Sequence, residues 1–475
     1  MKLLDALEIN NTITNTKGGE YYKSSYDANL DLFCAVSRFQ EDSEIEDVFY
    51  RAYKEDKNLA VANILNFLDI RGGKGERRVF KVCFSKLISL DKEMALKVLS
   101  FIPELGRYDY ILEGIDTCIQ DSVLEMIQKQ LKEDIESSYP SLLAKWLPSL
   151  RTHNANSSFA KKLAKLLNMT EKEYRKTLST LRSKINIVEK NLTEKTYDKI
   201  DFSKVPAKAM LKYGNCFANE IKDRYEEYLE SLEKGETKVN TGGLFVNDII
   251  KRVYYGDIEK TLVDAMWTSQ KDVLKGVDKN ILVVADTSGS MFSFGGLPYF
   301  TSIGLAIYTA ERNKGAFHDR FISFSMKPTL QKVEGETIVE KIHNIESIVA
   351  NTDIDKVFEL ILNTMTSNNL SSDELPSHIV IISDMEFDDG VHSKGGTNFS
   401  GWKKAFEEAG FKLPTIIFWN VAGETYGVPV TKHDNDVALI SGYSTNVLEK
   451  LFNLDEYNPI DSMIEILNKY LELIK

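Results

Sequence analysis

Oxygen-bearing side chains follow an apolar run in the last half of the chain. The segment ILVVADTSGSM places Asp286, Ser288 and Ser290 at alternate positions directly after that run. A carboxylate and two hydroxyls are hard donors, which suit Mg²⁺ or Mn²⁺ in octahedral coordination with several waters retained. The pattern therefore predicts a divalent-cation site, with Mg²⁺ as the first choice. The alternative is that Asp286 only caps a turn beside the two serines.

Two later segments carry further candidate ligands. The apolar run HIVIIS is followed by Asp384, and Thr352 with Asp353 stands just before the helical pattern DKVFELIL. We expect Asp384 and Thr352 to complete the site, although Thr352 and Asp353 could equally form a plain helix cap. The triplet Gly395-Gly396-Thr397 offers a second threonine, but we prefer Thr352 to Thr397. We also expect the loop after Asp286 to lie at the surface.

Strand-length apolar runs alternate with helical segments from residue 278 to residue 475. The expected strands are 280–286, 320–325, 378–384, 415–421 and 436–441, and the expected helices are 295–313, 353–365, 399–410 and 459–474. Continuous apolar strands with crossover helices predict a doubly wound parallel sheet, and MKPTLQKVEG could add a short antiparallel edge hairpin. In such sheets ligands bind beyond the carboxyl ends of the strands, where Asp286 and Asp384 both lie.

Residues 278–475 resemble the von Willebrand factor A family. That family binds a cation through a metal-ion-dependent adhesion site, which is Asp-x-Ser-x-Ser with a threonine and an aspartate from later loops. Carried over, Asp286, Ser288 and Ser290 are the first-loop ligands, Thr352 is the second-loop hydroxyl, and Asp384 binds directly or through water. The resemblance also implies that a carboxylate from a protein partner fills the open coordination position. Many members have Gly-Gly-Thr in the second loop, whereas here that triplet follows Asp384.

Residues 1–277 have the pattern of successive helices. Apolar residues recur at three- and four-residue spacing in DANLDLFCAVSRF, IEDVFYRAYKE, KNLAVANILNFLDI and RRVFKVCFSKLISL. Short breaks between them predict stacked helical hairpins of the HEAT type. The expected fold class is α + α/β, with an N-terminal α-helical repeat domain (1–277) and a C-terminal doubly wound von Willebrand A domain (278–475). We expect the repeats to curve round to the C-terminal domain as a closed ring or deep crescent.

Positive charge gathers in two stretches of a chain whose net charge is −12. Residues 142–190 contain 11 basic and 3 acidic residues, and residues 71–81 contain five basic residues and one acidic residue. Residues 278–475, in contrast, contain 16 basic and 28 acidic residues. Basic patches attract phosphate backbones, but a solvated helix face has the same composition. From charge alone, the candidate RNA contacts are Arg71, Lys74, Arg77, Arg78, Lys145, Arg151, Lys161, Lys162, Lys165, Arg175, Lys176, Arg182 and Lys184. The segment RGGKGERR lacks the spacing of a phosphate-binding P-loop.

The order of the two domains resembles the Ro (TROVE) ring proteins, which bind misfolded and small non-coding RNAs. Phrases such as ILNFLDIRGGKGERR and LLAKWLPSLR suit a related bacterial and phage branch. The resemblance implies a ring that closes against the A domain, binds single-stranded RNA on a basic helical surface, and docks a partner through Mg²⁺. The second interpretation is a metal-dependent protein scaffold or adaptor, for example for a AAA+ machine or a phage assembly, without RNA binding.

Several classes of protein are disfavoured. The four cysteines have no CxxC spacing, which argues against a disulfide framework or a zinc site. The sequence contains no stretch of about 18 apolar residues, so it predicts no membrane span. No serine, cysteine or histidine stands in a recognisable nucleophile motif, so we expect a binding protein and not an enzyme, with a metal-dependent hydrolase as the least favoured alternative. The expected form is a cytoplasmic monomer.

Overall fold

The computed structural model describes residues 11–14, 18–150, 155–185, 187–256, 258–324, 328–345, 353–387, 398–422 and 427–475. After a short N-terminal hairpin, helix follows helix as far as residue 268. The helices are α2 (Ala28–Ala35), α3 (Asp42–Glu55), α4 (Lys57–Leu68), α5 (Arg77–Leu90), α6 (Lys92–Leu105), η1 (Tyr108–Gly114), α7 (Gln120–Glu136), α8 (Leu143–Trp146), α9 (Ala155–Leu166), α10 (Glu171–Lys184), α11 (Val188–Glu194), η2 (Tyr197–Lys199), η3 (Phe202–Lys204), α12 (Ala207–Glu220), α13 (Lys222–Glu233), α14 (Val246–Tyr255) and α15 (Lys260–Thr268).

Local sequence explains where several of these helices begin. The Asp56 side chain accepts hydrogen bonds from the amides of Asn58 and Leu59 at the start of α4. Thr170 and Glu173 form a reciprocal capping box at the start of α10. Each cap satisfies amides that have no partner inside the helix. The four helices expected between residues 27 and 90 are confirmed as α2, α3, α4 and α5.

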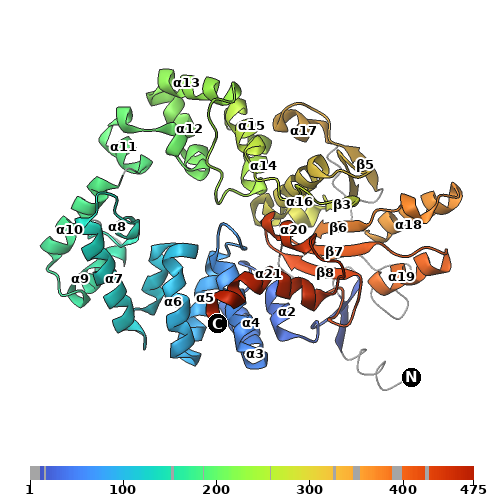
Figure 1. The fold of residues 1–475 in the computed structure, drawn as a ribbon, viewed down its shortest axis with the longest axis horizontal. Helices are drawn as coiled ribbons and strands as arrows, with labels where there is room; N and C mark the ends of the chain where they lie inside the picture. The colour runs from blue at the N-terminus through green and yellow to red at the C-terminus, as the bar shows by residue number, and fades with distance from the viewer. Residues whose placement is uncertain are drawn as a thin grey trace.

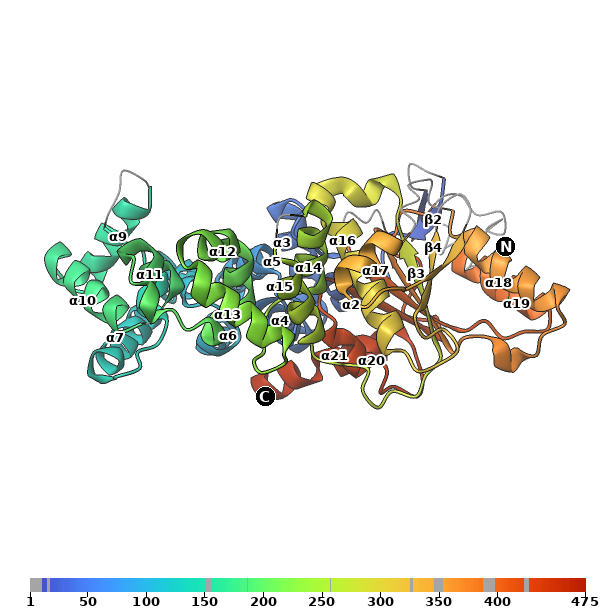
Figure 2. The same ribbon diagram turned by 90° about the horizontal axis from the view of Figure 1, so that it is seen from above.

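The helices follow one another round an arc whose two ends meet the C-terminal part of the chain (Figure 1). At one end, α2 lies against strand β8 (Val437–Ser441), and at the other end, α14 packs on helix α16 (Ser293–Arg312). Seen edge-on, the arc and the sheet share one layer (Figure 2). The contacts at both ends confirm the expectation that the helices bring the start of the chain back to the C-terminal domain.

The C-terminal part contains a six-stranded sheet in the order β5-β4-β3-β6-β7-β8. All neighbouring strands are parallel except β5, which pairs antiparallel with β4 at the edge. The strands are β3 (Ile281–Asp286), β4 (Arg320–Phe324), β5 (Thr329–Lys332), β6 (His378–Ser383), β7 (Thr415–Asn420) and β8. Every residue of β3 and β6 is buried, as the continuous apolar runs predict. The expected parallel strands and the antiparallel edge hairpin are both confirmed.

Helices before and after the sheet strands cover this part of the chain. They are α16, α17 (Ile338–Asn344), α18 (Asp355–Ser367), α19 (Asn398–Glu408), α20 (Asn446–Leu451) and α21 (Pro459–Ile474). Gly304 lets α14 approach α16 closely, because a Cβ there would lie 3.0 Å from side-chain atoms of Ile250 and Val246. Within the described residues, no helix is long and apolar enough to cross a membrane.

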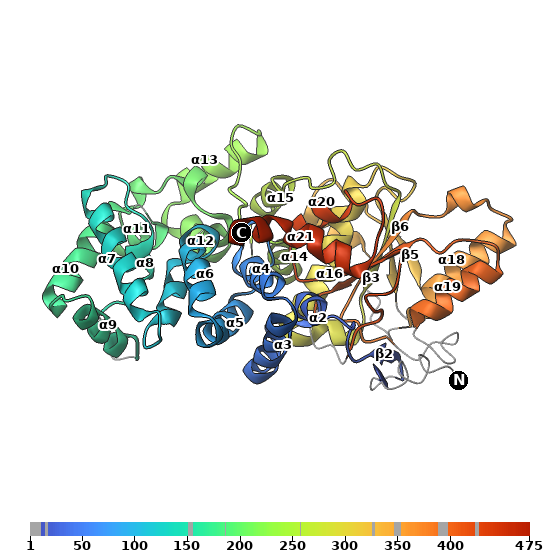
Figure 3. The same cartoon turned by 60° about the horizontal axis from the view of Figure 1, so that its bottom comes forward.

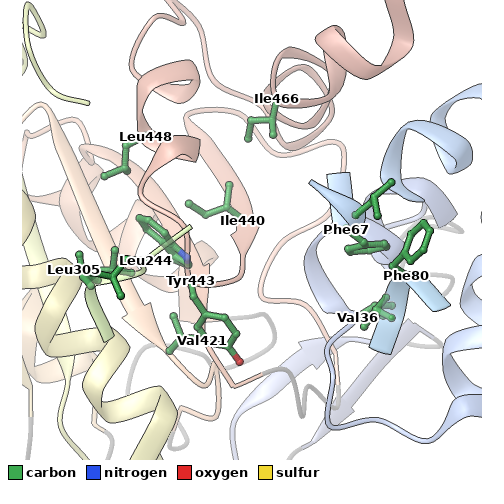
Figure 4. Close-up of a cluster of buried hydrophobic side chains, with 14 of the residues drawn as sticks. Val36, Phe67, Phe80, Leu244, Leu305, Val421, Ile440, Tyr443, Leu448 and Ile466 are labelled. Carbon is green, nitrogen blue, oxygen red and sulfur yellow. The ribbon is translucent and has the colours of Figure 1, made fainter. Parts of the chain in front are cut away.

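One hydrophobic core continues from the sheet into the helical arc (Figure 4). Ile440 on β8 and Leu448 on α20 belong to the same cluster as Phe67 on α4 and Phe80 on α5. Burying such side chains stabilises the fold by about 25 cal/mol for each Å² of apolar surface. The helices and the sheet therefore share one core and are packed against each other.

The N-terminal hairpin also belongs to the sheet side of the molecule. Strands β1 (Thr12–Thr14) and β2 (Glu20–Tyr22) pair antiparallel, and Tyr22 forms a bridge with Val428 in the loop after β7. The amide of Phe387, just after β6, donates a hydrogen bond of 2.6 Å to the buried hydroxyl of Tyr21. The hairpin therefore lies beside the loops that follow the carboxyl ends of β6 and β7.

The last helix, α21, lies along α4 of the helical arc as well as beside β8 (Figure 3). The Asp69 carboxylate joins the two elements, because its Oδ2 accepts hydrogen bonds from Lys469 Nζ (2.8 Å) and Tyr470 Oη (3.0 Å). Its Oδ1 accepts from the amides of Arg71 and Gly72. Burial alone would raise the pKa of Asp69, but the bonds from Lys469 and the loop amides lower it below the usual range.

We expect Asp69→Ala to lower the free energy of unfolding by about 2 to 4 kcal/mol at neutral pH, because it leaves buried donors without a partner. A lowered folded-state pKa means that the contribution is present above about pH 4 and is lost as the pH falls through the folded value. Urea unfolding at pH 7 and pH 3 measures both effects. Asp47→Ala, which removes an exposed pair with Arg51, is the control and should cost no more than about 1 kcal/mol. Equal losses for the two variants would contradict the anchoring role of Asp69.

Candidate metal site

The candidate metal site lies where the winding of the sheet reverses. From β3 the chain passes to β4 and β5 on one side of the sheet, and then to β6, β7 and β8 on the other. Ligands of such sheets bind beyond the carboxyl ends of the two strands at this switch point. Asp286 is the last residue of β3, and Asp384 directly follows β6. Since β3 and β6 are parallel neighbours, tertiary structure brings the two acids to one place.

Hydroxyl groups and amides surround the two carboxylates. Ser383 Oγ donates to Asp286 Oδ2 over 2.6 Å and lies 3.4 Å from Asp384 Oδ1. The amide of Ser288 donates to Asp286 Oδ1 over 2.9 Å, and Ser288 Oγ lies 3.0 Å from Ser290 Oγ. Two carboxylates and three hydroxyls therefore gather within one small region.

The electrostatics of this region favour a cation. Burial, and after it the charge of Asp384, raises the pKa of Asp286 well above the usual range, against the opposing hydrogen bonds from Ser383 and Ser288. No lysine or arginine in the described ranges forms an ion pair with either acid. Two buried carboxylates repel each other unless a positive charge lies between or beside them.

The donor set fits a hard divalent cation. Mg²⁺ typically binds one or two carboxylates and keeps several waters, and serine hydroxyls are suitable further ligands. No cluster of three His, Cys, Asp or Glu side chains suited to a metal occurs among the residues that the structure describes. Beside the two carboxylates, hydroxyls and water would have to complete the coordination of Mg²⁺ or Mn²⁺.

The predicted ligands have different outcomes. Asp286, Ser288, Ser290 and Asp384 lie together as expected, whereas Thr352 and Thr397 fall outside the described residues. The expectation that the loop after Asp286 lies at the surface is wrong for Ser288, which is only 2% exposed, and the two acids, Asp286 and Asp384, are also buried. Asp286 ends one fully buried strand and Asp384 directly follows another, whereas in the loop after Asp286 only Gly289 is exposed and Ser290 is half-buried. Asp353 pairs with Lys356 at 2.9 Å.

Ser383 was missed from the sequence. Its hydroxyl is the closest partner of Asp286 outside the first loop. Its position in the sequence, between a fully apolar strand and Asp384, could have identified it. In a parallel pair, the last residue of β6 must lie beside the end of β3. A hydroxyl at that position holds the carboxylate of Asp286 in a fixed orientation, as supporting side chains of metal ligands commonly do.

For the metal-free protein in EDTA, we expect Asp286→Asn to raise the free energy of unfolding at pH 8 by at least about 1 kcal/mol, the value of roughly one pKa unit. A carboxyl whose folded-state pKa is raised loses stability as the pH rises from about 4 through the folded value, because the unfolded state ionises first. Urea unfolding at pH 8 and pH 5 is the measurement, and the gain should be smaller at pH 5. An asparagine variant that is less stable at pH 8 would contradict the repulsion between Asp286 and Asp384.

The candidate RNA-binding residues do not form one surface. Lys74 is only 6% exposed and lies between the helical arc and β8. Arg182 donates to Ala144 O, Leu147 O and Ser149 Oγ, all over 2.7 Å, and thereby holds α10 against the loop after α8. Lys184 Nζ bonds to the carbonyls of Ile135 and Ser137. These three cations hold the fold together, and Arg151 lies outside the described residues.

The remaining candidates are at the surface. Lys145, Lys161 and Lys162 form ion pairs with Glu189, Glu171 and Asp116. Lys165, Arg175 and Lys176 are exposed on α9 and α10 and have no ion pair with a described residue. Arg71 lies in the turn between α4 and α5. Arg77 and Arg78 are the first residues of α5, where Arg77 is exposed and Arg78 pairs with Asp42 over 2.7 Å.

Arg77 and Arg78 line a cavity of about 410 Å³ where the two ends of the arc meet the sheet. Arg38 and Lys208 bring further cations, and Arg38 lies 4.7 Å from the ring of Tyr443. Lys208 Nζ lies 4.9 Å from the ring of Phe245 and pairs with Asp248. Sequence reasoning missed Arg38, Lys208, Phe245 and Tyr443, because they come from segments far apart in the chain and carry no motif.

The known sequences that resemble this chain carry no description of an activity. Residues 280–466 match a family model described as a domain of unknown function (DUF7788), and residues 119–282 match another domain of unknown function (DUF2828). The two matches overlap at residues 280–282, where β3 begins. The chain is also 28% identical over 498 residues to "Uncharacterized protein L728" of Acanthamoeba polyphaga mimivirus, an alignment that covers 95% of this chain and 86% of the viral protein.

Proposed function

We propose that the sheet domain is of the von Willebrand factor A type and that it docks a partner through a divalent cation. Asp286, Ser288, Ser290 and Asp384 would hold Mg²⁺ or Mn²⁺, and a threonine from a later loop would complete the set. The observation that carries this proposal is the buried Asp286–Asp384 pair at the switch point, with Ser383 between the two carboxylates. A cation there relieves the repulsion between the acids and offers one coordination position to a partner's carboxylate.

The arrangement supports binding and not catalysis. A hydrolase would need a nucleophile and a base within hydrogen-bond reach of the reacting atoms. The described contacts of Asp286 and Asp384 involve serines and backbone amides only. All four cysteines are unpaired, which suits a reducing compartment, and we place the protein in the cytoplasm as a monomer.

Calorimetric titration of the full-length, metal-free chain with Mn²⁺ tests the cation site. We expect one binding event per chain, weaker binding of Mg²⁺ than of Mn²⁺, and loss of the event when Ser288 and Ser290 are both replaced by alanine. Ser100→Ala, which removes an exposed hydroxyl on α6 of the helical arc, is the control. Absence of binding at millimolar Mn²⁺ would overturn the proposal.

RNA binding by the helical ring is the second part of the proposed function. It is favoured by the cavity at Arg77, where the Arg38 guanidinium lies beside the ring of Tyr443 and the Lys208 ammonium lies beside the ring of Phe245. Proteins that bind single-stranded nucleic acids combine cations for the phosphates with aromatic rings for the bases. We therefore propose a Ro-like ring that binds single-stranded, misfolded or small non-coding RNA. A metal-dependent protein scaffold or adaptor without RNA binding is the alternative outcome of the same test, which is a titration of labelled RNA.

A further inference from the structure

A second cavity, of about 240 Å³, lies between the helical arc and the far edge of the sheet. The glycine-rich turn after α4 forms one wall, and the end of β8 with α20 and α21 forms the other. Its lining residues are Phe33, Asn66, Arg71, Gly72, Gly73, Lys74, Lys271, Ser441, Ser444, Asn446, Val447, Glu449, Lys450, Ile466 and Lys469. Ser441 belongs to β8, two strands away from β6, so this cavity is separate from the Asp286 region.

The lining of this cavity is strongly positive. Arg71, Lys74, Lys271, Lys450 and Lys469 face it, whereas Glu449 is the single acid among the lining residues. Glu449 pairs with Lys271 at 2.5 Å, and Lys469 pairs with Asp69. Arg71, Lys74 and Lys450 have no ion pair within the described part of the chain. The charges of Arg71 and Lys450, and the amine of Lys74, therefore lack a described carboxylate partner around this space.

Lys74 lies at the bottom of this charge cluster. Its side chain is buried, and its ammonium donates to the carbonyl of Phe33 and, over 2.8 Å, to Ser441 Oγ. An ammonium has three donors, so these two bonds leave one N–H without a hydrogen-bond acceptor among the described residues, and the centres of the Phe33 and Phe67 rings lie 4.2 Å and 5.4 Å from Nζ. Burial lowers the pKa of Lys74 to about 7, although Cys34 and Glu76 act in the opposite direction. A buried cation without a carboxylate partner is costly unless an anion approaches it.

The turn that carries Lys74 is held in one shape. The amide of Gly73 bonds to Asp69 O and that of Lys74 to Asn66 O. A Cβ at Gly73 would lie 2.4 Å from Asn66 O and 2.6 Å from Tyr470 Oη, so only glycine fits there. A rigid turn positions the amine before a ligand arrives, which lowers the entropic cost of binding.

We propose that this cavity binds a small tetrahedral oxyanion of the phosphate type, either free or as the terminal phosphate of a larger ligand. Lys74 would contact the anion from the buried side, and Arg71 and Lys450 from the rim, while Ser444 and Asn446 offer neutral donors. The volume is below the roughly 300–1,000 Å³ of pockets that enclose drug-sized ligands, which favours a single phosphate group over a buried nucleotide. The site requires neither the divalent cation nor RNA.

Calorimetry with inorganic phosphate, at constant ionic strength and in EDTA, tests the proposal on the full-length chain. Lys74→Met keeps the length of the side chain and removes its charge, and Lys450→Glu reverses a charge at the exposed rim, where folding is insensitive. Each should weaken phosphate binding at least tenfold. Lys172→Glu, an equal charge change on exposed α10, should leave the affinity unchanged. If wild type binds no phosphate, or if Lys450→Glu and Lys172→Glu weaken it equally, the proposal fails.

Two further titrations sharpen the result. AMP in place of phosphate distinguishes the sources, because a free-anion site would reject it and a site for a terminal phosphate would accept it. Sulfate, which does not change its charge between pH 6 and pH 8, isolates the protonation of Lys74. The groups that face this amine are Cys34 from α2, Glu76 from its own loop and Ser441 from β8. The charged groups around the rest of the cavity are Arg71, Lys271, Glu449, Lys450 and Lys469.

Sulfate affinity should fall up to about tenfold from pH 6 to pH 8 in wild type, because the amine with a pKa of about 7 loses its proton over that range. The same experiment with Lys74→Met should show no such fall. An equal pH dependence in the two proteins would exclude Lys74 as a ligand of the anion.

Discussion

Replacing Asp286 by alanine is expected to weaken Mn²⁺ binding at least about 100-fold, which is the upper end of the loss caused by altering only the supporting residues of a metal ligand. Asp286 supplies a direct carboxylate oxygen in the proposed site, and no neighbouring acid can replace it. Asp384 is itself a ligand of the proposed site and therefore cannot take the place of Asp286. Calorimetric titration of the metal-free, full-length chain with Mn²⁺, and then with Mg²⁺, measures the loss.

The matched control for this experiment is Asp353→Ala. Asp353 is also an acid just before a helix of the same domain, but its carboxylate is paired with Lys356. This variant should bind Mn²⁺ within a factor of about three of wild type, equivalent to less than 1 kcal/mol. Because Asp286 is buried, circular dichroism must first show that the alanine variant is folded, and Asp286→Asn serves as the isosteric replacement. Identical isotherms for wild type and Asp286→Asn would refute the cation site.

RNA affinity is expected to fall about 100-fold between 50 mM and 200 mM salt. Neutralising each phosphate of a single strand releases counterions and contributes about −0.7 to the slope of log affinity against log salt. Four to six contacts then give a slope of roughly −3 to −4. Fluorescence anisotropy with a labelled single-stranded RNA, at several salt concentrations, measures this slope. Sequence preference should be weak, since charge and stacking accept any base.

The exposed cations decide where the RNA lies. Arg77→Gln changes an exposed guanidinium at the cavity between the ends of the arc, and should reduce the magnitude of the slope by about 0.7 if it touches a phosphate. A triple change of Lys165, Arg175 and Lys176 to glutamine tests the separate surface of α9 and α10. Lys403→Gln, on the exposed side of α19 in the acidic domain, is the control for net charge and should leave the slope unchanged.

Two outcomes would contradict RNA binding by these basic residues. An unchanged slope in both Arg77→Gln and the triple variant would mean that these basic groups are a solvated face, as their helical spacing also allows. No binding at 50 mM salt by any single-stranded or structured RNA would leave the metal-dependent protein scaffold as the better account of the ring.

The sequence by itself determined the elements around the candidate metal site. Apolar runs of strand length ending in Asp286 and Asp384 are local patterns, and both strands form as predicted. Parallel strands at a switch point must bring their carboxyl ends together, so the pairing of these acids followed from pattern and topology alone. The helices between residues 27 and 90 were also predictable, since spacing and caps are properties of contiguous residues.

Only the tertiary structure decided which side chains are buried between distant segments. Lys74 has the composition of an exposed turn, yet packing of that turn against β8 places its amine beside Ser441, 367 residues later in the chain. The C-terminal helix α21 has an ordinary amphipathic pattern, but its pairing with α4 depends on Asp69 meeting Lys469 and Tyr470. The periodicity of apolar residues shows which face of a helix is buried, but it does not show which segment covers that face. Contact between distant segments depends on complementary shape and charge across the whole fold.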